Sequence, residues 1–276
     1  MSETLQRVKT FLHPLAEKGV ALAFSGGVDS SLLLAVLTRM HREKPFPFLV
    51  LNAVSPLQSA GDEEEVRKAE KESGAEIFRL ECDPLALEPV RNNDPLRCYY
   101  CKKMLFETMI AFAKARGIDT LLEGTHGDDL NAYRPGRKAL EELKVISPLA
   151  RLGISKKEVR AMAAELNLQT AHRPASPCLA TRFDYGTYLT EEKLQQVAAG
   201  EGFLRKFLPP AADLRLRVQE KQCRIEVAPE YFSALLEHRE EIVEKLKGAG
   251  FEKVTLDLAG FASGGYDAKL KGMKDV

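Results

Sequence analysis

A short run of small and polar residues, Ser25-Gly26-Gly27-Val28-Asp29-Ser30, separates two apolar stretches near the N-terminus. The stretch before it, 20–24, is typical of a short buried strand, and the stretch after it, 31–37, is typical of a helix. This order places the small residues at the N-terminus of the helix, where unpaired backbone N–H groups and the positive end of the helix dipole bind anions. The pattern therefore predicts a loop that binds the pyrophosphate part of ATP.

The residue types within this loop suit the phosphates of ATP and their metal ion. Gly26 and Gly27 have no Cβ, so their backbone N–H groups can come close to an anion. We expect hydroxyl donors from Ser25 and Ser30 and a magnesium-binding carboxylate from Asp29. A Walker-type phosphate loop is excluded because no Gly-Lys-Ser/Thr sequence follows. An ordinary glycine-rich turn that carries Asp and Ser is the remaining alternative.

A second polar segment, Glu123-Gly124-Thr125, ends another strand-like run and is followed by Asp128 and Asp129. If both segments lie at the same edge of one sheet, the second segment closes the ATP site. Glu123 or Thr125 would then contact ribose or substrate, and Asp128 or Asp129 would help to hold magnesium. An Asp-rich helix start with a solvated face is the alternative, because Asp is favoured at helix caps.

Two of the five cysteines, Cys98 and Cys101, stand three residues apart beside cationic side chains. This spacing puts both thiols on one face of a helical turn, and nearby cations favour the thiolate, so the pair indicates a metal or redox role. A structural zinc site normally needs a second pair of ligands, which the chain lacks, and the surrounding sequence is not that of a thioredoxin-like domain.

Cys178 is the third thiol that we assign to this group. Three cysteines suit an iron–sulfur cluster with one iron left open, where a ligand such as sulfide can bind and react. The alternative is two half-buried thiols and an unrelated loop cysteine, because cysteine is commonly a small core residue. We interpret Cys82 and Cys223, which lie in strand-like runs, in that structural sense.

Several arginines accompany these groups. The segment 170–187 has no periodicity and combines Cys178 with Arg182, which indicates a functional loop rather than a linker. Arg215 and Arg217 alternate along a predicted strand, so both guanidinium groups lie on one face, as bidentate recognition of phosphate or carboxylate requires. A solvated strand face is the alternative for this pair. Arg134 lies in a basic turn that either meets phosphate or is simply exposed.

The elements that must position these residues follow from the rest of the pattern. Strand-like runs at 46–54, 76–80 and 120–123 are separated by helical segments at 61–73 and 99–116, which predicts an α/β fold with a parallel sheet. The end of the chain predicts a smaller α+β domain with a helix at 190–207, strands at 214–218 and 222–227, a helix at 229–247 and a strand at 251–258. We expect two domains, 1–187 for ATP and 188–276 for substrate or oligomerisation.

Composition narrows the function classes. The chain has 276 residues, of which 45% are hydrophobic and 29% charged, as in an ordinary globular protein. Forty basic and forty acidic side chains cancel, so nucleic acid is disfavoured as a partner and a small-molecule substrate is favoured. The sequence has no signal-peptide core and no apolar stretch of membrane-spanning length, so we expect a cytoplasmic protein.

Taken together, these segments resemble the LarE family of ATP-dependent sulfur transferases over nearly the full chain. The resemblance rests on the loop Ser25–Ser30 together with Glu123-Gly124-Thr125, Arg134-Pro135-Gly136, Ser147-Pro148-Leu149, Pro177-Cys178-Leu179-Ala180-Thr181-Arg182, Tyr185-Gly186, Arg215-Leu216-Arg217-Val218 and Leu256-Asp257-Leu258-Ala259-Gly260-Phe261. It implies the adenine nucleotide alpha hydrolase-like fold of pyrophosphate-loop enzymes, with ATP and Mg²⁺ as cofactors and a hexameric assembly.

The resemblance also implies a reaction. Such an enzyme adenylylates a carboxylate of a pyridinium dicarboxylate mononucleotide and then installs sulfur as a thiocarboxylate, on the route to the nickel-pincer nucleotide of lactate racemase. Some members give up the sulfur of the cysteine that matches Cys178. Others resemble this chain in adding Cys98 and Cys101 and are understood to hold a 4Fe–4S cluster that passes on sulfide from a sulfide source. The expected catalytic residues are then Asp29, Glu123, Cys178 and Arg182.

Two other functions use the same ATP loop. A tRNA-thiolating enzyme would share the loop and the three cysteines, but the chain has no additional zinc-knuckle pairs and no excess of basic residues to follow an RNA backbone. A non-catalytic adenine-nucleotide-binding module would bind ATP without releasing pyrophosphate.

Overall fold

A computed structural model describes residues 2–131, 135–174 and 176–262. Among these, residues up to 55, 61–87 and 96–173 form a first compact unit, and residues 56–60, 88–95 and 174–262 form a second one. Within the described residues, no helix is both long and apolar enough to cross a membrane.

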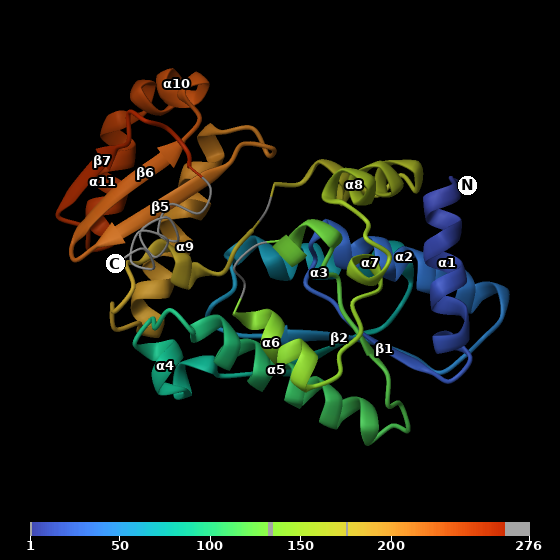
Figure 1. Cartoon of the computed structure of the whole chain (residues 1–276). Helices are drawn as coiled ribbons and strands as arrows, with labels where there is room; N and C mark the ends of the chain where they lie inside the picture. Colours follow the sequence, from blue (N-terminus) through green and yellow to red (C-terminus); the bar gives the residue numbers. More distant parts are fainter. Residues whose placement is uncertain (1, 132–134, 175, 263–276) are drawn as a thin grey trace. The chain divides into compact units, whose positions relative to one another are not determined.

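The first unit is built on a parallel four-stranded sheet (Figure 1). Its strands are β1 (Val20–Ala23), β2 (Phe48–Val54), β3 (Ile77–Glu81) and β4 (Leu121–Leu122), in the spatial order β3-β2-β1-β4. A single parallel bridge from Leu122 to Ile146 continues the sheet beyond β4. The predicted α/β fold is thus confirmed. The order reverses between β1 and β4, which is where such sheets bind ligands.

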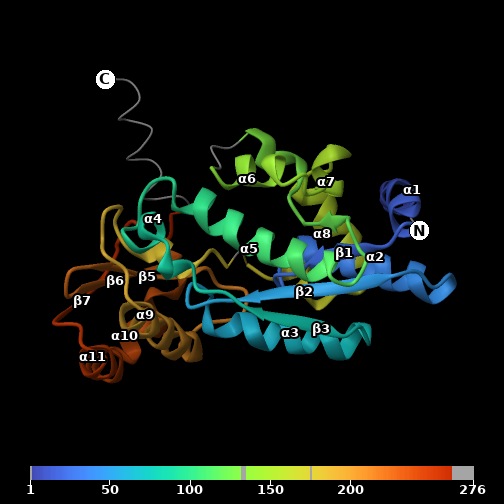
Figure 2. The same ribbon diagram turned by 90° about the horizontal axis from the view of Figure 1, so that it is seen from below.

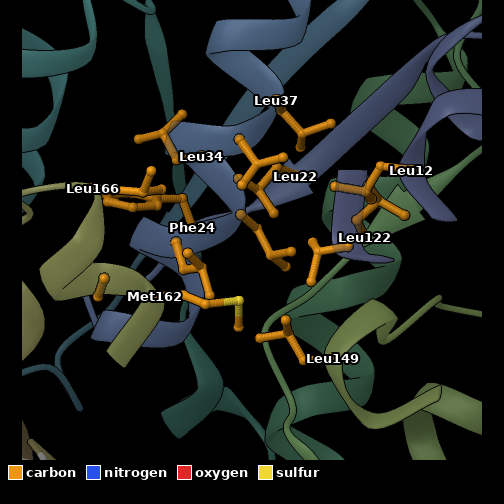
Figure 3. Packing of buried hydrophobic residues seen from close by; sticks show 14 of the residues in the cluster. Leu12, Leu22, Phe24, Leu34, Leu37, Leu122, Leu149, Met162 and Leu166 are labelled. Atoms are coloured by element: carbon orange, nitrogen blue, oxygen red, sulfur yellow. The ribbon is translucent and has the colours of Figure 1, made fainter. Parts of the chain in front are cut away.

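Helices cover both faces of this sheet because successive strand residues point to opposite sides. On one face, α1 (Glu3–Ala16), α2 (Val28–Glu43), α3 (Ala60–Ser73) and α8 (Lys156–Glu165) enclose an apolar cluster that includes Leu22, Leu37 and Met162 (Figure 3). On the other face, Ala21 packs with α5 (Arg97–Lys114) and α6 (Gly136–Glu142). Figure 2 shows α3 and α5 on opposite sides of β2 and β3.

Short elements complete the first unit, and their caps follow local sequence rules. Ser155 and Glu158 form a reciprocal capping box at the start of α8, and their Ser-x-x-Glu spacing is typical of a helix start. The other short segments are η1 (Pro84–Ala86), η2 (Gly127–Asn131), α7 (Pro148–Arg151) and η3 (Gln169–His172).

The second unit contains a three-stranded sheet of order β5-β6-β7. Strands β5 (Leu214–Gln219) and β6 (Gln222–Val227) are antiparallel, and β7 (Lys253–Leu256) is parallel to β6. The helix α9 (Glu191–Leu204) lies close to this sheet at Gly200, where a Cβ would come within 2.5 Å of Leu216. Two further helical segments in this unit are α4 (Glu88–Arg91) and η5 (Arg205–Phe207).

One predicted helix of the second unit is wrong as a continuous element. Instead of a single helix over 229–247, the structure has η6 (Pro229–Tyr231), α10 (Phe232–Glu237) and α11 (Arg239–Gly248). The break falls at His238, whose backbone leaves the helical region and whose ring stacks on Phe207 with centroids 4.5 Å apart. A tertiary contact therefore interrupts a helix that local propensity favours.

The division of the chain differs from the predicted boundary after residue 187. Residues 174–187 pack within the second unit, against its two short segments from earlier in the chain. The Asn93 side chain donates hydrogen bonds to the carbonyls of Ala180, Phe183 and Asp184, and Leu179 N–H donates to Leu57 O at 2.8 Å. These contacts join residues that are about ninety or more positions apart, which no local pattern reveals.

Candidate functional site

The predicted pyrophosphate loop follows β1 and leads directly into α2. Gly26 has a φ of +75°, a conformation that favours glycine, and Gly27 is the extended residue that precedes the helix at Val28. Ser25 N–H donates to Ser30 Oγ at 3.3 Å, and Ser30 Oγ in turn donates to Gly27 O at 3.0 Å. Both serines thus shape the loop that presents the helix N-terminus.

The end of β4 touches this loop. An ideal Cβ on Gly124 would lie 2.9 Å from Ser30 N and 3.0 Å from Asp29 Cβ, so only glycine allows the two segments to come this close. The structure therefore brings together the two polar segments that the sequence predicts at one sheet edge. They meet at the point where the strand order reverses.

Glu123 is buried beside this contact, with 6% of its surface exposed. Its carboxylate accepts hydrogen bonds from Thr125 N–H at 3.0 Å, from Thr125 Oγ1 at 2.7 Å, and from Ser147 Oγ. Glu123 therefore fixes the backbone turn at the end of β4. Its predicted contact with ribose or substrate stays a prediction.

Asp29 lies in the first turn of α2 and has two different carboxylate oxygens. Oδ2 is 2.5 Å from Lys156 Nζ, in an ion pair whose side chains are partly exposed. Oδ1 is buried and has no hydrogen-bond donor among the described residues. A buried oxygen of this kind fits a ligand to Mg²⁺, which prefers carboxylate oxygens and few protein ligands.

Lys156 is a site residue that sequence reasoning did not identify. It stands at the first position of α8, between the capping-box residues Ser155 and Glu158, whose pattern indicates a helix start and gives the lysine no role of its own. A lysine at a helix N-terminus opposes the helix dipole. That local conflict is the sequence signal for a role elsewhere, and here the ammonium pairs with Asp29.

Asp128 and Asp129 occupy separate positions after β4. Asp128 is exposed, and its Oδ2 accepts a hydrogen bond from Lys156 N–H at 2.8 Å, so it helps to cap α8. Asp129 is buried, with Oδ2 3.5 Å from His126 Nε2. Asp128 agrees with the cap-like alternative, whereas the burial of Asp129 does not fit a solvated face. The predicted magnesium role of either carboxylate stays a prediction.

Cys98 and Cys101 lie three residues apart at the start of α5, in the first unit, and both are half-buried. Gly136 packs on this turn, since a Cβ there would lie 3.2 Å from Cys98 O. Cys178 belongs to the second unit. Over residues 2–131, 135–174 and 176–262, no group of three or more His, Cys, Asp or Glu side chains is arranged to hold a metal ion. The predicted phosphate contact Arg134 lies outside the described residues.

Cys178 directly precedes the short helix η4 (Leu179–Arg182), and its backbone is held by a buried arginine. Arg182 is 1% exposed; its Nε and Nη2 each donate to the Glu201 carboxylate at 2.9 Å. Its Nη1 donates to the carbonyls of Pro177 at 2.6 Å and Cys178 at 3.3 Å, and Thr181 Oγ1 donates to Cys178 O at 2.8 Å. Arg182 thus positions the Cys178 loop.

Glu201 is the second site residue that sequence reasoning missed. Besides binding Arg182, its Oε1 accepts a hydrogen bond from Leu216 N–H of β5 at 2.9 Å. It therefore connects α9, the Cys178 loop and the sheet of the second unit. No sequence signal pairs a glutamate of α9 with an arginine nineteen residues earlier.

Arg217 on β5 also supports the Cys178 loop. Its Nε donates to Glu226 Oε2 at 3.0 Å, and its Nη1 donates to Thr181 O. Glu226 is shared with Arg224 of the same sheet at 2.9 Å. With 7% of its surface exposed, Arg217 is not part of a solvated strand face, so that alternative is wrong for it.

Arg215 is buried on the same strand, with 6% exposed. Its Nη1 donates to Leu214 O at 2.6 Å, and its guanidinium carbon lies 5.1 Å from the centre of the Phe261 ring. Burial, and next the nearby cation of Arg182, lower the pKa of Arg215 to about 10. A bound anion would offset the cost of keeping this cation out of water.

Comparison with known proteins adds independent information. No family model matches the chain. The chain is 36% identical to an uncharacterized protein of Synechocystis sp. over 96% of its own length and 97% of the relative. It is 34% identical to the pyridinium-3,5-bisthiocarboxylic acid mononucleotide synthase of Lactiplantibacillus plantarum, over 89% of this chain and 87% of the relative. It is 24% identical to a tRNA-specific 2-thiouridylase of Acetivibrio thermocellus over 67% of this chain and 63% of the relative.

Proposed function

The chain belongs to the LarE family of ATP-dependent sulfur transferases, with the pyrophosphate-loop fold, and from this membership we propose the reaction that it catalyses. The enzyme adenylylates a carboxylate of a pyridinium dicarboxylate mononucleotide and converts it into a thiocarboxylate. The substrate class follows from the named relative in Lactiplantibacillus plantarum. The single structural observation that carries the proposal is the Asp29 carboxylate of the pyrophosphate loop, whose Oδ2 pairs with Lys156 and whose buried Oδ1 has no donor among the described residues.

In the first step, the substrate carboxylate attacks the α-phosphorus of ATP. The bond to the β-phosphate oxygen breaks, pyrophosphate leaves, and an acyl-adenylate forms. The backbone N–H groups at the start of α2 hold the departing phosphates, and Asp29 Oδ1 would bind Mg²⁺, which neutralises their charge. Lys156 Nζ lies at this carboxylate and supplies a further cation for the same phosphates.

In the second step, sulfur attacks the acyl carbon and AMP leaves. We propose that Cys98, Cys101 and Cys178 hold a 4Fe–4S cluster, which when bound would supply sulfide at its open iron. The support is the pair of thiols on one helical turn and the family membership. Arg182 keeps the Cys178 backbone in place, while Arg215 and Arg217 orient the phosphate and carboxylates of the substrate.

The alternative sulfur source is Cys178 itself. Its thiolate would attack the acyl carbon and expel AMP, which leaves a thioester. Loss of the Cα proton to a base, with cleavage of the Cβ–Sγ bond, would then release the thiocarboxylate and leave dehydroalanine at position 178. Intact-protein mass spectrometry after turnover distinguishes the two sources, because only this route removes the elements of H₂S from the chain.

The proposed activity is tested by incubating the anaerobically purified chain with ATP, Mg²⁺, sulfide and the dicarboxylate mononucleotide. We expect AMP, pyrophosphate and a thiocarboxylate product by mass spectrometry, and about four irons per chain for the three-cysteine cluster. Cys178→Ser should abolish the thiocarboxylate but leave pyrophosphate release, whereas Cys82→Ser, at another half-buried cysteine, should change neither. Pyrophosphate release that is independent of any carboxylate would contradict the proposal.

Two further properties are part of the proposal. We expect a homo-oligomer, hexameric as the family resemblance implies, which sedimentation equilibrium measures directly. Thiolation of tRNA is the alternative activity, favoured by the similarity to a tRNA-specific 2-thiouridylase. The formal net charge of zero argues against it, and a gel shift with tRNA at physiological salt tests it.

A further inference from the structure

Arg173 contacts the pyrophosphate loop through its side chain. Its Nη1 donates to Gly26 O at 2.9 Å, and its Nη2 donates to Asp62 Oδ1 at 3.2 Å. Nη1 also lies 3.7 Å from Glu65 Oε2, and the side chain is 20% exposed. One guanidinium therefore joins the loop after β1 to the first turns of α3.

The backbone of Arg173 is itself held in place. Arg160 of α8 donates from Nη2 to Arg173 O at 2.9 Å, and also donates to Ala171 O. Because α8 also carries Lys156, which pairs with Asp29, the loop is held at two points by residues of one region. One contact is at the glycine turn and the other at the start of α2.

The contact with Gly26 decides which way the loop backbone faces. In a trans peptide the carbonyl and the following N–H point to opposite sides of the chain. Fixing Gly26 O on Arg173 therefore turns the N–H of Gly27 away from the guanidinium. Gly26 and Gly27, on either side of this peptide bond, have no Cβ, so without an anchor the peptide can flip and present a carbonyl to the phosphates instead.

We propose that Arg173 is a positioning residue that holds the pyrophosphate loop in its anion-binding conformation. The inference rests on the proposed function only in that the loop binds the pyrophosphate of ATP. Arg173 is not proposed as a phosphate ligand, because Asp62 and Glu65 already compensate its charge. Its effect is to preorganise N–H donors before the nucleotide arrives, which saves the cost of ordering them on binding.

The test measures the affinities of Arg173→Ala for pyrophosphate, MgATP and AMP by calorimetry, together with its thermal unfolding. We expect the affinities for pyrophosphate and MgATP to fall about tenfold, as for the loss of one charge-assisted hydrogen bond. The affinity for AMP, which lacks the β- and γ-phosphates, should stay within about twofold. A general loss of structure would instead lower the affinities for all three ligands. Arg173→Lys keeps a cation beside Asp62. It should unfold at the temperature of the unaltered chain and regain part of the pyrophosphate affinity that Arg173→Ala loses.

Arg79→Ala is the matched control. Arg79 pairs with Glu63 and Glu70, also on α3, at 3.5 and 3.0 Å, and the variant has the same change in net charge without a contact to the loop. If Arg173→Ala and Arg79→Ala lower the affinity for pyrophosphate equally, the positioning role is overturned. If the unaltered chain does not bind pyrophosphate, the inference and the proposed function both fall. If Arg173→Ala shows the expected selective loss in a chain without sulfur transfer, the inference stands and the proposed function fails.

Discussion

The loop after β1 in the first unit and the Cys178 loop in the second unit are built in opposite ways. The first is made mainly of backbone, and one oxygen of its central carboxylate has no donor among the described residues. The second is held by buried guanidinium groups that are bound to carboxylates and carbonyls. A site that awaits a charged ligand leaves a polar group unsatisfied, whereas a loop whose backbone must stay in place has its supporting groups satisfied.

The largest effect should come from removing the charge at the loop. We expect Asp29→Asn to lower the rate of pyrophosphate release on the order of a thousandfold, because a metal ion contributes several kcal/mol of charge stabilisation. Thermal unfolding should be little changed, since among the described residues the carboxylate pairs with a partly exposed lysine. Rapid-quench measurement of pyrophosphate with saturating MgATP gives the rate.

Asp128→Asn is the control for this prediction. Asp128 is exposed at the same edge, and the amide oxygen of asparagine can still accept the hydrogen bond from Lys156 N–H. The control should stay within about threefold of the unaltered enzyme, since surface substitutions of this kind are usually mild. An equal loss of the rate of pyrophosphate release in both variants would mean that Asp29 has no special role in binding magnesium. The contrast between the two loops would then be wrong.

Breaking the buried ion pair between Arg182 and Glu201 should lower the stability of the second unit as well as sulfur transfer. Arg182→Met leaves Glu201 buried without its cation, and we expect the free energy of unfolding to fall by about 3 kcal/mol. Combining it with Glu201→Leu should recover part of that loss, because the uncompensated charge is gone. Urea unfolding followed by circular dichroism measures both variants.

An exposed ion pair provides the comparison for the buried pair of Arg182 and Glu201. Arg239 and Glu240 are 72% and 88% exposed, so Arg239→Ala should cost less than about 0.5 kcal/mol. A similar cost for Arg182→Met would show that the Cys178 loop does not depend on its buried arginine.

The two loops also differ in how much of each can be predicted from the sequence. Ser25 to Ser30 and the end of β4 follow local rules, so their elements and their meeting at one edge are predictable from strand, glycine and helix patterns. The pairing of Arg182 with Glu201 and of Arg173 with Gly26 is not, because each joins residues whose spacing has no helical or strand period. The break at His238 likewise depends on a ring of another element.

Lys156 should show a smaller and more specific effect. Lys156→Met removes a cation 2.5 Å from Asp29 Oδ2, so we expect the KM for MgATP to rise about tenfold while the carboxylate binds free Mg²⁺ more tightly. Titration calorimetry of Mg²⁺ with and without a non-hydrolysable ATP analogue measures the two effects. Lys157→Met, at the exposed neighbouring position, should change neither quantity. A change of the same sign in both affinities would mean that Lys156 serves only the fold.

The smallest effect tests how dry the interior of the second unit is. Burial raises the pKa of the Cys223 thiol to about 11 from an ordinary value of 9.0. Between these pH values the folded chain keeps a proton that the unfolded chain loses, so this group makes stability fall as pH rises through that window. Within this window we expect the thiol to contribute a slope of up to about 1.4 kcal/mol per pH unit, which Cys223→Ala should remove from the plot of unfolding free energy against pH. The offset from the smaller side chain is the same at every pH, so only the slope reports the thiol. An unchanged slope between pH 9 and 11 would mean that water reaches the Cys223 thiol in the folded chain.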